Sequence, residues 1–156
     1  MNAPSADPFV PRDPDYARRV RASFAQQRAM ALIGATLARI EPGCTEIHLP
    51  YSEALTQQHG FIHGGVVGMI ADSAAGYAAA TLVAADAEVL TVEYKLNLVT
   101  PAEGERLVAR GEVIRAGRTL TITRAEVFAV KAGRWSACAL MQQTIMSVHS
   151  RRAAAA

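Results

Sequence analysis

The sequence predicts an α+β domain in which a curled antiparallel sheet wraps around one long central helix. The first observation is that residues 63–83 lack proline, are rich in alanine and carry a single charge, a composition typical of a buried helix. The second is that strand-like segments separated by turn signals follow that stretch, at residues 91–99, 106–115, 120–130 and 135–148. The third is a pair of shorter apolar segments before it. One sheet packed on one helix accommodates this succession.

Length and composition set the domain organisation. The chain has 156 residues, of which 51% are hydrophobic, which is enough for one domain with a core. The net charge of +2 gives no electrostatic reason to expect a nucleic-acid partner. We predict a flexible arm, a single domain and a frayed tail, at residues 1–14, 15–149 and 150–156. The arm contains four prolines and no apolar run, so we expect no signal peptide.

Three further features bear on compartment and ligands. Cys44 and Cys138 lie far apart, which favours a reducing, cytoplasmic location over a disulfide framework. The apolar stretch carries Asp72 near its middle, and an Asp there costs about 2.5–3.5 kcal/mol in a membrane helix. We therefore expect no membrane span. His59 and His63 have no third ligand at a convincing spacing, so we expect no metal.

The first half of the chain predicts a helix, a strand hairpin and a polar connection, in that order, at residues 15–27, 30–40, 45–49 and 51–62. Val20 and Phe24 lie four residues apart, as on the apolar face of a short helix. The turn sequence Glu41-Pro42-Gly43 separates the two strands of the hairpin.

The second half predicts a meander of four strands. The first of them alternates between an apolar and a polar face, formed by Val92, Tyr94, Leu96 and Leu98 and by Thr91, Glu93, Lys95 and Asn97. A single sheet on a single helix leaves one edge unpaired. We therefore expect a homodimer with a continuous sheet.

Asp72 is the first candidate for chemistry. It lies in an apolar helix with no Lys or Arg three or four residues away. A buried carboxylate without a partner is costly. Either it reaches a cleft as a general base or nucleophile, or it bonds a neighbouring loop and has only a structural role. The residues alone leave both interpretations open.

The second candidate is the helix start at His63-Gly64-Gly65. Free N–H groups and the positive end of the helix dipole make it a natural oxyanion site, although the glycines could also serve only the helix entry. His63 and Asp72 are nine residues apart, about 13.5 Å along a helix and on opposite faces. This excludes a dyad within one chain, and a triad with Ser73. The two ends can share a site only across two subunits.

The segment Gln57-Gln58-His59-Gly60-Phe61-Ile62-His63-Gly64-Gly65, followed by Ala71-Asp72-Ser73-Ala74, resembles the signature of the PaaI-like branch of the hotdog acyl-CoA thioesterases, in the 4-hydroxybenzoyl-CoA thioesterase superfamily. Residues 91–102 and 115–120 are similar to later strands of that family. The resemblance covers about residues 28–148. It implies a hotdog fold, hydrolysis of an acyl-CoA to acid and coenzyme A, and sites shared within a dimer, with dimers pairing into a tetramer.

The resemblance also implies roles for individual residues. Asp72 activates water or attacks the thioester, and the Gly64 N–H, next to His63, holds the thioester oxygen. Gln57, where the family usually has Asn, helps to place the substrate, and Thr91 orients the water. No cofactor is implied. The residues expected along the substrate are Gly65, Thr100, Pro101, Arg115, Gly117 and Arg118. From the residues alone, Arg115 and Arg118 are as easily solvated surface arginines.

Two alternatives stay open. One is a hotdog module that binds acyl-CoA without cleaving it, which would not need an acid at position 72. The other is an acyl-thioester dehydratase, whose His and acid arrangement is not found here. The acyl group itself is not specified by the sequence, although we expect Phe61, Met69 and Tyr77 in the pocket wall.

Overall fold

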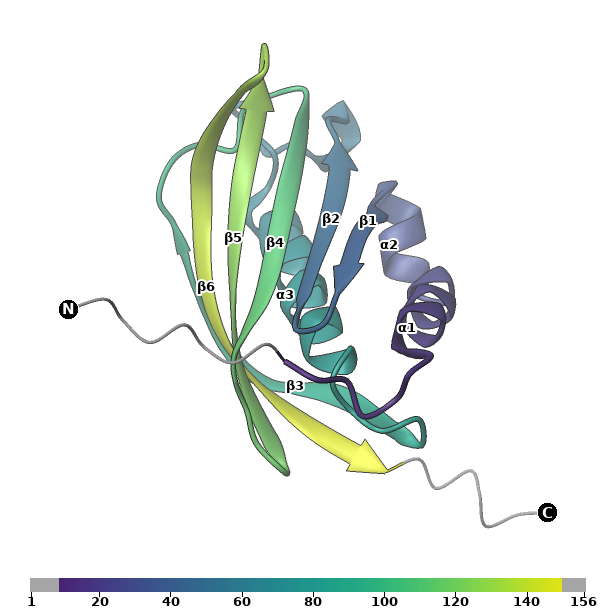
Figure 1. Cartoon of the computed structure of the whole chain (residues 1–156). Helices are drawn as coiled ribbons and strands as arrows, with labels where there is room; N and C mark the ends of the chain where they lie inside the picture. Colours follow the sequence, from purple (N-terminus) through teal and green to yellow (C-terminus); the bar gives the residue numbers. More distant parts are fainter. Residues whose placement is uncertain (1–8, 150–156) are drawn as a thin grey trace.

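The computed structural model describes residues 9–149, in which six antiparallel strands curve around one long helix (Figure 1). The elements follow in the order α1 (Tyr16–Ala25), α2 (Arg28–Ile33), β1 (Thr36–Glu41), β2 (Cys44–Pro50), a 3-10 turn (Glu53–Leu55), α3 (Gly64–Ala80), β3 (Ala87–Leu98), β4 (Arg106–Ala116), β5 (Leu120–Lys131) and β6 (Arg134–His149). The predicted α+β architecture, a curled sheet wrapped around one central helix, is confirmed.

The predicted strand at residues 30–40 is wrong in its first half. That half is helix α2, and β1 begins only at Thr36. Met30 and Ile33 are buried three residues apart, which is the period of a helix. Gly34, with φ of 74°, then ends the helix in the left-handed conformation. A short apolar run fits a strand and a buried helix equally well, so the pattern alone does not distinguish helix α2 from the predicted strand.

The predicted four-strand meander is also wrong for β3. The sheet order is β1-β2-β4-β5-β6-β3, so β3 pairs with β6 and not with β4. The free side of β4 is taken by β2, with Ile47 opposite Ala109. β3 therefore finds its partner at the other edge of the sheet, where its own outer side stays open.

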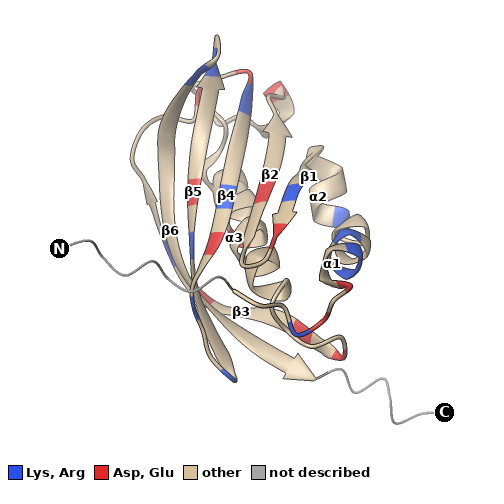
Figure 2. Ribbon diagram, in the orientation of Figure 1, with Lys and Arg blue, Asp and Glu red and all other residues tan. Residues whose placement is uncertain are grey.

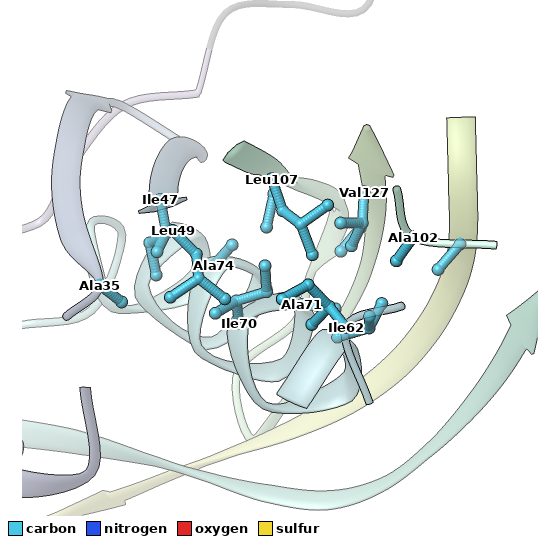
Figure 3. Close-up of a cluster of buried hydrophobic side chains, with 14 of the residues drawn as sticks. Ala35, Ile47, Leu49, Ile62, Ile70, Ala71, Ala74, Ala102, Leu107 and Val127 are labelled. Atoms are coloured by element: carbon cyan, nitrogen blue, oxygen red, sulfur yellow. The ribbon is translucent and has the colours of Figure 1, made fainter. Parts of the chain in front are cut away.

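The core lies between α3 and the concave face of the sheet (Figure 3). Ile70, Ala71 and Ala74 of α3 are fully buried against side chains of β2, β4 and β5, namely Ile47, Leu49, Leu107 and Val127. The helix comes so close to β4 that a Cβ at Gly111 would lie under 3.0 Å from the backbone of Ala74. Small residues on α3 and β4 thus set the distance between the helix and the sheet, and with it the position of Asp72.

The segment before α1 packs on the domain. Asp13 is buried and accepts a hydrogen bond from Arg19 Nε at 2.8 Å. Arg19 also donates to the carbonyl oxygens of Ala80 and Val83, at 3.0 and 3.1 Å, at the end of α3. These contacts attach the end of the predicted arm to the domain. The rest of that arm, residues 1–8, and the predicted tail, residues 150–156, lie outside the described residues.

The exposed side chains differ from strand to strand across the sheet. Acidic and basic residues lie side by side on neighbouring strands, as on β2 and β4 (Figure 2), where Arg110 donates to Glu46 at 2.8 Å. Edge strand β3 instead exposes apolar side chains, with Leu90, Val92, Tyr94 and Leu98 each 48–56% exposed. No helix within residues 9–149 combines the length and apolar character needed to cross a membrane.

Candidate active site

Asp72 is held by neutral donors from two strands. Helix α3 places it, half-buried, on the side that faces β3 and β6. The Thr91 hydroxyl donates to Asp72 Oδ1 at 2.8 Å. Gln143 Nε2 donates to the same oxygen and, at 2.9 Å, to Thr91 Oγ1. The structure therefore places Thr91 beside the carboxylate.

Gln143 is a site residue that the sequence analysis missed. It lies on β6, more than seventy positions along the chain from Asp72, and its side chain is fully buried. Met141 and Ile145, two residues to either side, point to the same buried face and are apolar. An amide in this apolar register is the signal that could have identified it, because a buried amide needs partners.

A cavity of about 440 Å³ opens beside Asp72, between α1, α3 and β3, and we call it the acid cavity. Its lining includes polar groups in pairs. Ser23 Oγ lies 3.4 Å from the Tyr77 hydroxyl, and Ser73 Oγ donates to Gln27 Oε1 at 3.3 Å. Burial raises the pKa of Tyr77, so its hydroxyl stays protonated and able to donate.

The start of α3 has one amide that is not used. His63 caps the helix, with its Nδ1 accepting from Gly65 N at 2.9 Å, so the expected substrate contact of the Gly65 N–H has a competitor. The N–H groups of Val66 and Val67 donate to the His63 carbonyl. Within residues 9–149 the Gly64 N–H has no acceptor. Gly64 is therefore the one predicted oxyanion donor that is free for a ligand.

A second cavity, of about 450 Å³, lies at this helix start, and we call it the amide cavity. It is lined by four of the predicted residues, Gln57, Gly64, Thr100 and Pro101. Gln57 uses its Oε1 to accept from the backbone N–H of His59, which shapes its own loop. Of the expected pocket-wall residues, Phe61 lines the amide cavity and Tyr77 the acid cavity, whereas Met69 lines neither.

The remaining predicted residues lie elsewhere. Arg115, Gly117 and Arg118 are exposed at the turn between β4 and β5 and line neither the acid cavity nor the amide cavity. The Gly117 N–H closes that turn on the Leu120 carbonyl at 2.9 Å. Among the described residues no three His, Cys, Asp or Glu side chains converge as a metal site would require.

The acid cavity and the amide cavity share no lining residue. Asp72 and Gly64 are eight residues apart on one helix, about 12 Å along its axis. One chain therefore presents the carboxylate and the free amide in two separate cavities.

Comparison with known proteins gives the family. Residues 59–135 match the sequence profile of the thioesterase superfamily. The solved structure of a thioesterase family protein from Silicibacter pomeroyi is 49% identical, with a TM-score of 0.85, over 86% of this chain and 99% of that one. The chain belongs to the thioesterase superfamily, and its fold is the predicted hotdog fold.

Two other named proteins are also similar to this chain. A protein of Deinococcus radiodurans, provisionally named an esterase, is 36% identical over 97 residues, 62% of this chain and 64% of that protein. The 1,4-dihydroxy-2-naphthoyl-CoA hydrolase of Listeria monocytogenes is 28% identical over 90 residues, 58% of this chain and 73% of the hydrolase. The chain spans 61–64% of the length of the esterase-named relatives it matches.

Proposed function

We propose that this protein hydrolyses an acyl-CoA thioester to the free acid and coenzyme A, as a PaaI-like member of its superfamily. The observation that carries the proposal is the Asp72 carboxylate, held by Thr91 and Gln143 at the mouth of a cavity of acyl size. Asp72 takes a proton from water as the water adds to the thioester carbon, or attacks that carbon itself. In both cases the C–S bond then breaks, and the thiolate of coenzyme A leaves and takes up a proton. After direct attack the acyl group remains on Asp72 as an anhydride, which a water molecule hydrolyses to the free acid.

The Gly64 N–H is the proposed oxyanion donor. It is a free amide at the positive end of α3, where charge on the thioester oxygen develops. The amide cavity around it has room for the thioester and the pantetheine arm, along Thr100 and Pro101. His63 supports the donor by capping the helix, and Gln57 shapes the loop beside it. Arg115 and Arg118, with Gly117, are proposed to reach the coenzyme A phosphates.

The complete site is proposed to form between two subunits. The open edge of β3 exposes four large apolar side chains, which is costly for a lone chain and suits an antiparallel continuation of the sheet by a second copy. Pairing of this kind would set the acid cavity of one subunit against the amide cavity of the other. Association of such dimers into a tetramer and a cytoplasmic location stay predictions.

The acid cavity also favours a kind of acyl group. Its volume of about 440 Å³ and its hydroxyl and amide lining suit a compact or aromatic acyl group with polar substituents better than a long aliphatic chain. The name of the Listeria relative, a hydrolase of a dihydroxylated aromatic acyl-CoA, agrees with this choice. A panel of aroyl-, arylacetyl- and straight-chain acyl-CoAs, followed by release of free thiol, tests it. Tight binding without release of thiol would support a binding module instead.

The decisive variant is Asp72→Asn, which keeps the shape and removes the base or nucleophile. We expect its turnover to fall more than a hundredfold while the circular dichroism spectrum and the dimer persist. Asp86→Asn is the matched control, because Asp86 is an exposed acid in the loop after α3 and should have near-normal turnover. Near-normal hydrolysis by Asp72→Asn would overturn the proposed function.

Gly64 offers a sharper test of the oxyanion donor. Proline is favoured at the first helical position, and His63, with φ of −60° and ψ of 136°, already has the backbone that precedes a proline. Gly64→Pro therefore removes the N–H with little change to the helix, and we expect turnover to fall about a hundredfold or more. Gly64→Ala is the control, since it introduces the same Cβ against Leu98 and keeps the N–H. Equal loss in both variants would contradict a role for the amide.

The two variants also test the shared site. A mixed dimer of Asp72→Asn and Gly64→Pro chains, isolated through two different tags, contains one site with both defects and one with neither. We expect it to recover about half of the wild-type activity, although each parent is inactive. If each chain held a complete site of its own, the mixed dimer would be as inactive as its parents.

A further inference from the structure

The hydrogen bonds at Asp72 are not shared evenly between its two oxygens. The Thr91 hydroxyl and Gln143 Nε2 both donate to Oδ1. Within residues 9–149 no donor contacts Oδ2. One oxygen of the carboxylate is thus held in place, and the other is left for a water molecule or a thioester carbon.

We propose that Gln143 is a positioning residue, which fixes the Asp72 carboxylate so that Oδ2 is the reacting oxygen. This inference rests on the proposed function and adds a residue to it. Gln143 is fully buried and does not line the acid cavity, whereas Asp72 and Thr91 do. It therefore acts through Asp72 and has no contact with the substrate.

The orientation of the Gln143 amide is determined by its neighbours. A carboxylate only accepts hydrogen bonds, so the NH₂ group must face Asp72. The amide oxygen on the other side accepts from the Thr123 hydroxyl at 3.2 Å, and Thr123 is itself fully buried on β5. A reversed amide would set two acceptors against each other at Asp72. Asp72 therefore selects the orientation, and the Thr123 hydroxyl, which also lies 3.4 Å from the Gln143 backbone carbonyl oxygen, completes the chain of hydrogen bonds at the other end.

The strands around Gln143 make this arrangement rigid. β6 lies inside the sheet, bonded to β5 on one side, where Thr123 is opposite Gln143, and to β3 on the other. Thr91 of β3, the second donor to Oδ1, is opposite Ile145 of β6. The adjacent strands β5, β6 and β3 therefore supply the Thr123 hydroxyl, the Gln143 amide and the Thr91 hydroxyl, respectively. These groups form one chain of hydrogen bonds, which ends on α3 at Asp72.

The test is Gln143→Met, which fills a similar volume and removes both the NH₂ group and the carbonyl oxygen of the amide. We expect kcat to fall about ten- to a hundredfold, the range for one hydrogen bond to a charged group, with KM for the same acyl-CoA changed less than about twofold. Gln142→Met is the matched control. Gln142 is the same residue one position earlier, exposed on the outer face, and its variant should keep the wild-type kcat.

Two further measurements separate positioning from stability. Thr123→Val, which removes only the remote end of the chain of hydrogen bonds, should lower kcat less than Gln143→Met and also leave KM unchanged. In an Asp72→Asn background, adding Gln143→Met should cause no further loss, because both changes act on one group. A wild-type kcat in folded Gln143→Met, or equal losses in kcat and affinity, would overturn the inference. If Gln143→Met fails to fold, a wild-type kcat in Thr123→Val overturns it. Activity in Asp72→Asn would instead overturn the proposed function.

Discussion

Gly111 gives the most direct test of how α3 is seated in the sheet. A Cβ at this position of β4 would lie under 3.0 Å from the carbonyl carbon and oxygen of Ala74 and from the amide nitrogen of Ala75. Ordinary carbon contacts are about 3.5–4.0 Å, so Gly111→Ala has to move the helix by on the order of 1 Å. The backbones of α3 and β4 cannot relieve this contact by a change of rotamer, as a side chain could. We expect a loss near the upper end of overpacking costs, about 3 kcal/mol in the free energy of unfolding.

Gly76→Ala is the same substitution with the opposite expected sign. Gly76 lies on α3, nothing would lie within 4 Å of its Cβ, and alanine is favoured over glycine inside a helix by about 1 kcal/mol. Urea unfolding, followed by the fluorescence of the single tryptophan, Trp135, at fixed protein concentration, measures both. Turnover of Gly111→Ala should also fall, since about 1 Å of displacement at Asp72 is enough to disturb the reaction. A wild-type urea midpoint for Gly111→Ala would refute the close contact between α3 and β4.

Three further outcomes are expected. Hydrogen bonds from Arg19, and then from the Asp15 N–H, lower the pKa of Asp13. The stabilising effect of Asp13 is therefore present above its ordinary pKa of 3.8 and is lost as the pH falls through the lower pKa of the folded state. The difference in melting temperature between wild type and Asp13→Asn should shrink on acidification below about pH 4 and not above it. Burial raises the pKa of Cys138 to about 11, so a thiol reagent at pH 8 should modify it only in urea, and native labelling that persists in Cys44→Ser would contradict this. Tyr77→Phe should lower kcat/KM about tenfold for a hydroxylated aromatic acyl-CoA and leave the unsubstituted analogue unaffected, and equal effects on both would exclude a hydrogen bond from Tyr77.

The sequence predicted those elements whose period is local. The alanine-rich helix and the segments that became β4, β5 and β6 were placed within a few residues of their observed bounds. Helix α2 was missed because a run of six apolar and long side chains has no period that separates helix from strand. The position of β3 could not be predicted from its own residues either. It depends on the pairing of β2 with the free edge of β4, and these two strands are about sixty residues apart in the sequence.

The candidate site was predictable to the same extent. Asp72 and the helix start at Gly64 stand out because an acid and two glycines are conspicuous in an apolar helix, and the resemblance to a family added Thr91 and Gln57. Gln143 has one local signal, an amide in the apolar register of β6, but nothing near it in sequence indicates that β6 passes behind Asp72. The use of the Gly65 N–H by His63 was also missed, because it depends on the rotamer of a capping side chain.

The nature of the partners at Asp72 explains why a helix this apolar carries one acid with no cation beside it. The ion pairs of residues 9–149 do not include Asp72. An arginine bound in the bidentate manner would hold both carboxylate oxygens and leave neither for chemistry. Two neutral donors on one oxygen offset part of the cost of partial burial and still leave Oδ2 open to the acid cavity. The arrangement that makes Asp72 tolerable in the fold is therefore also the one that would leave it available to the proposed substrate.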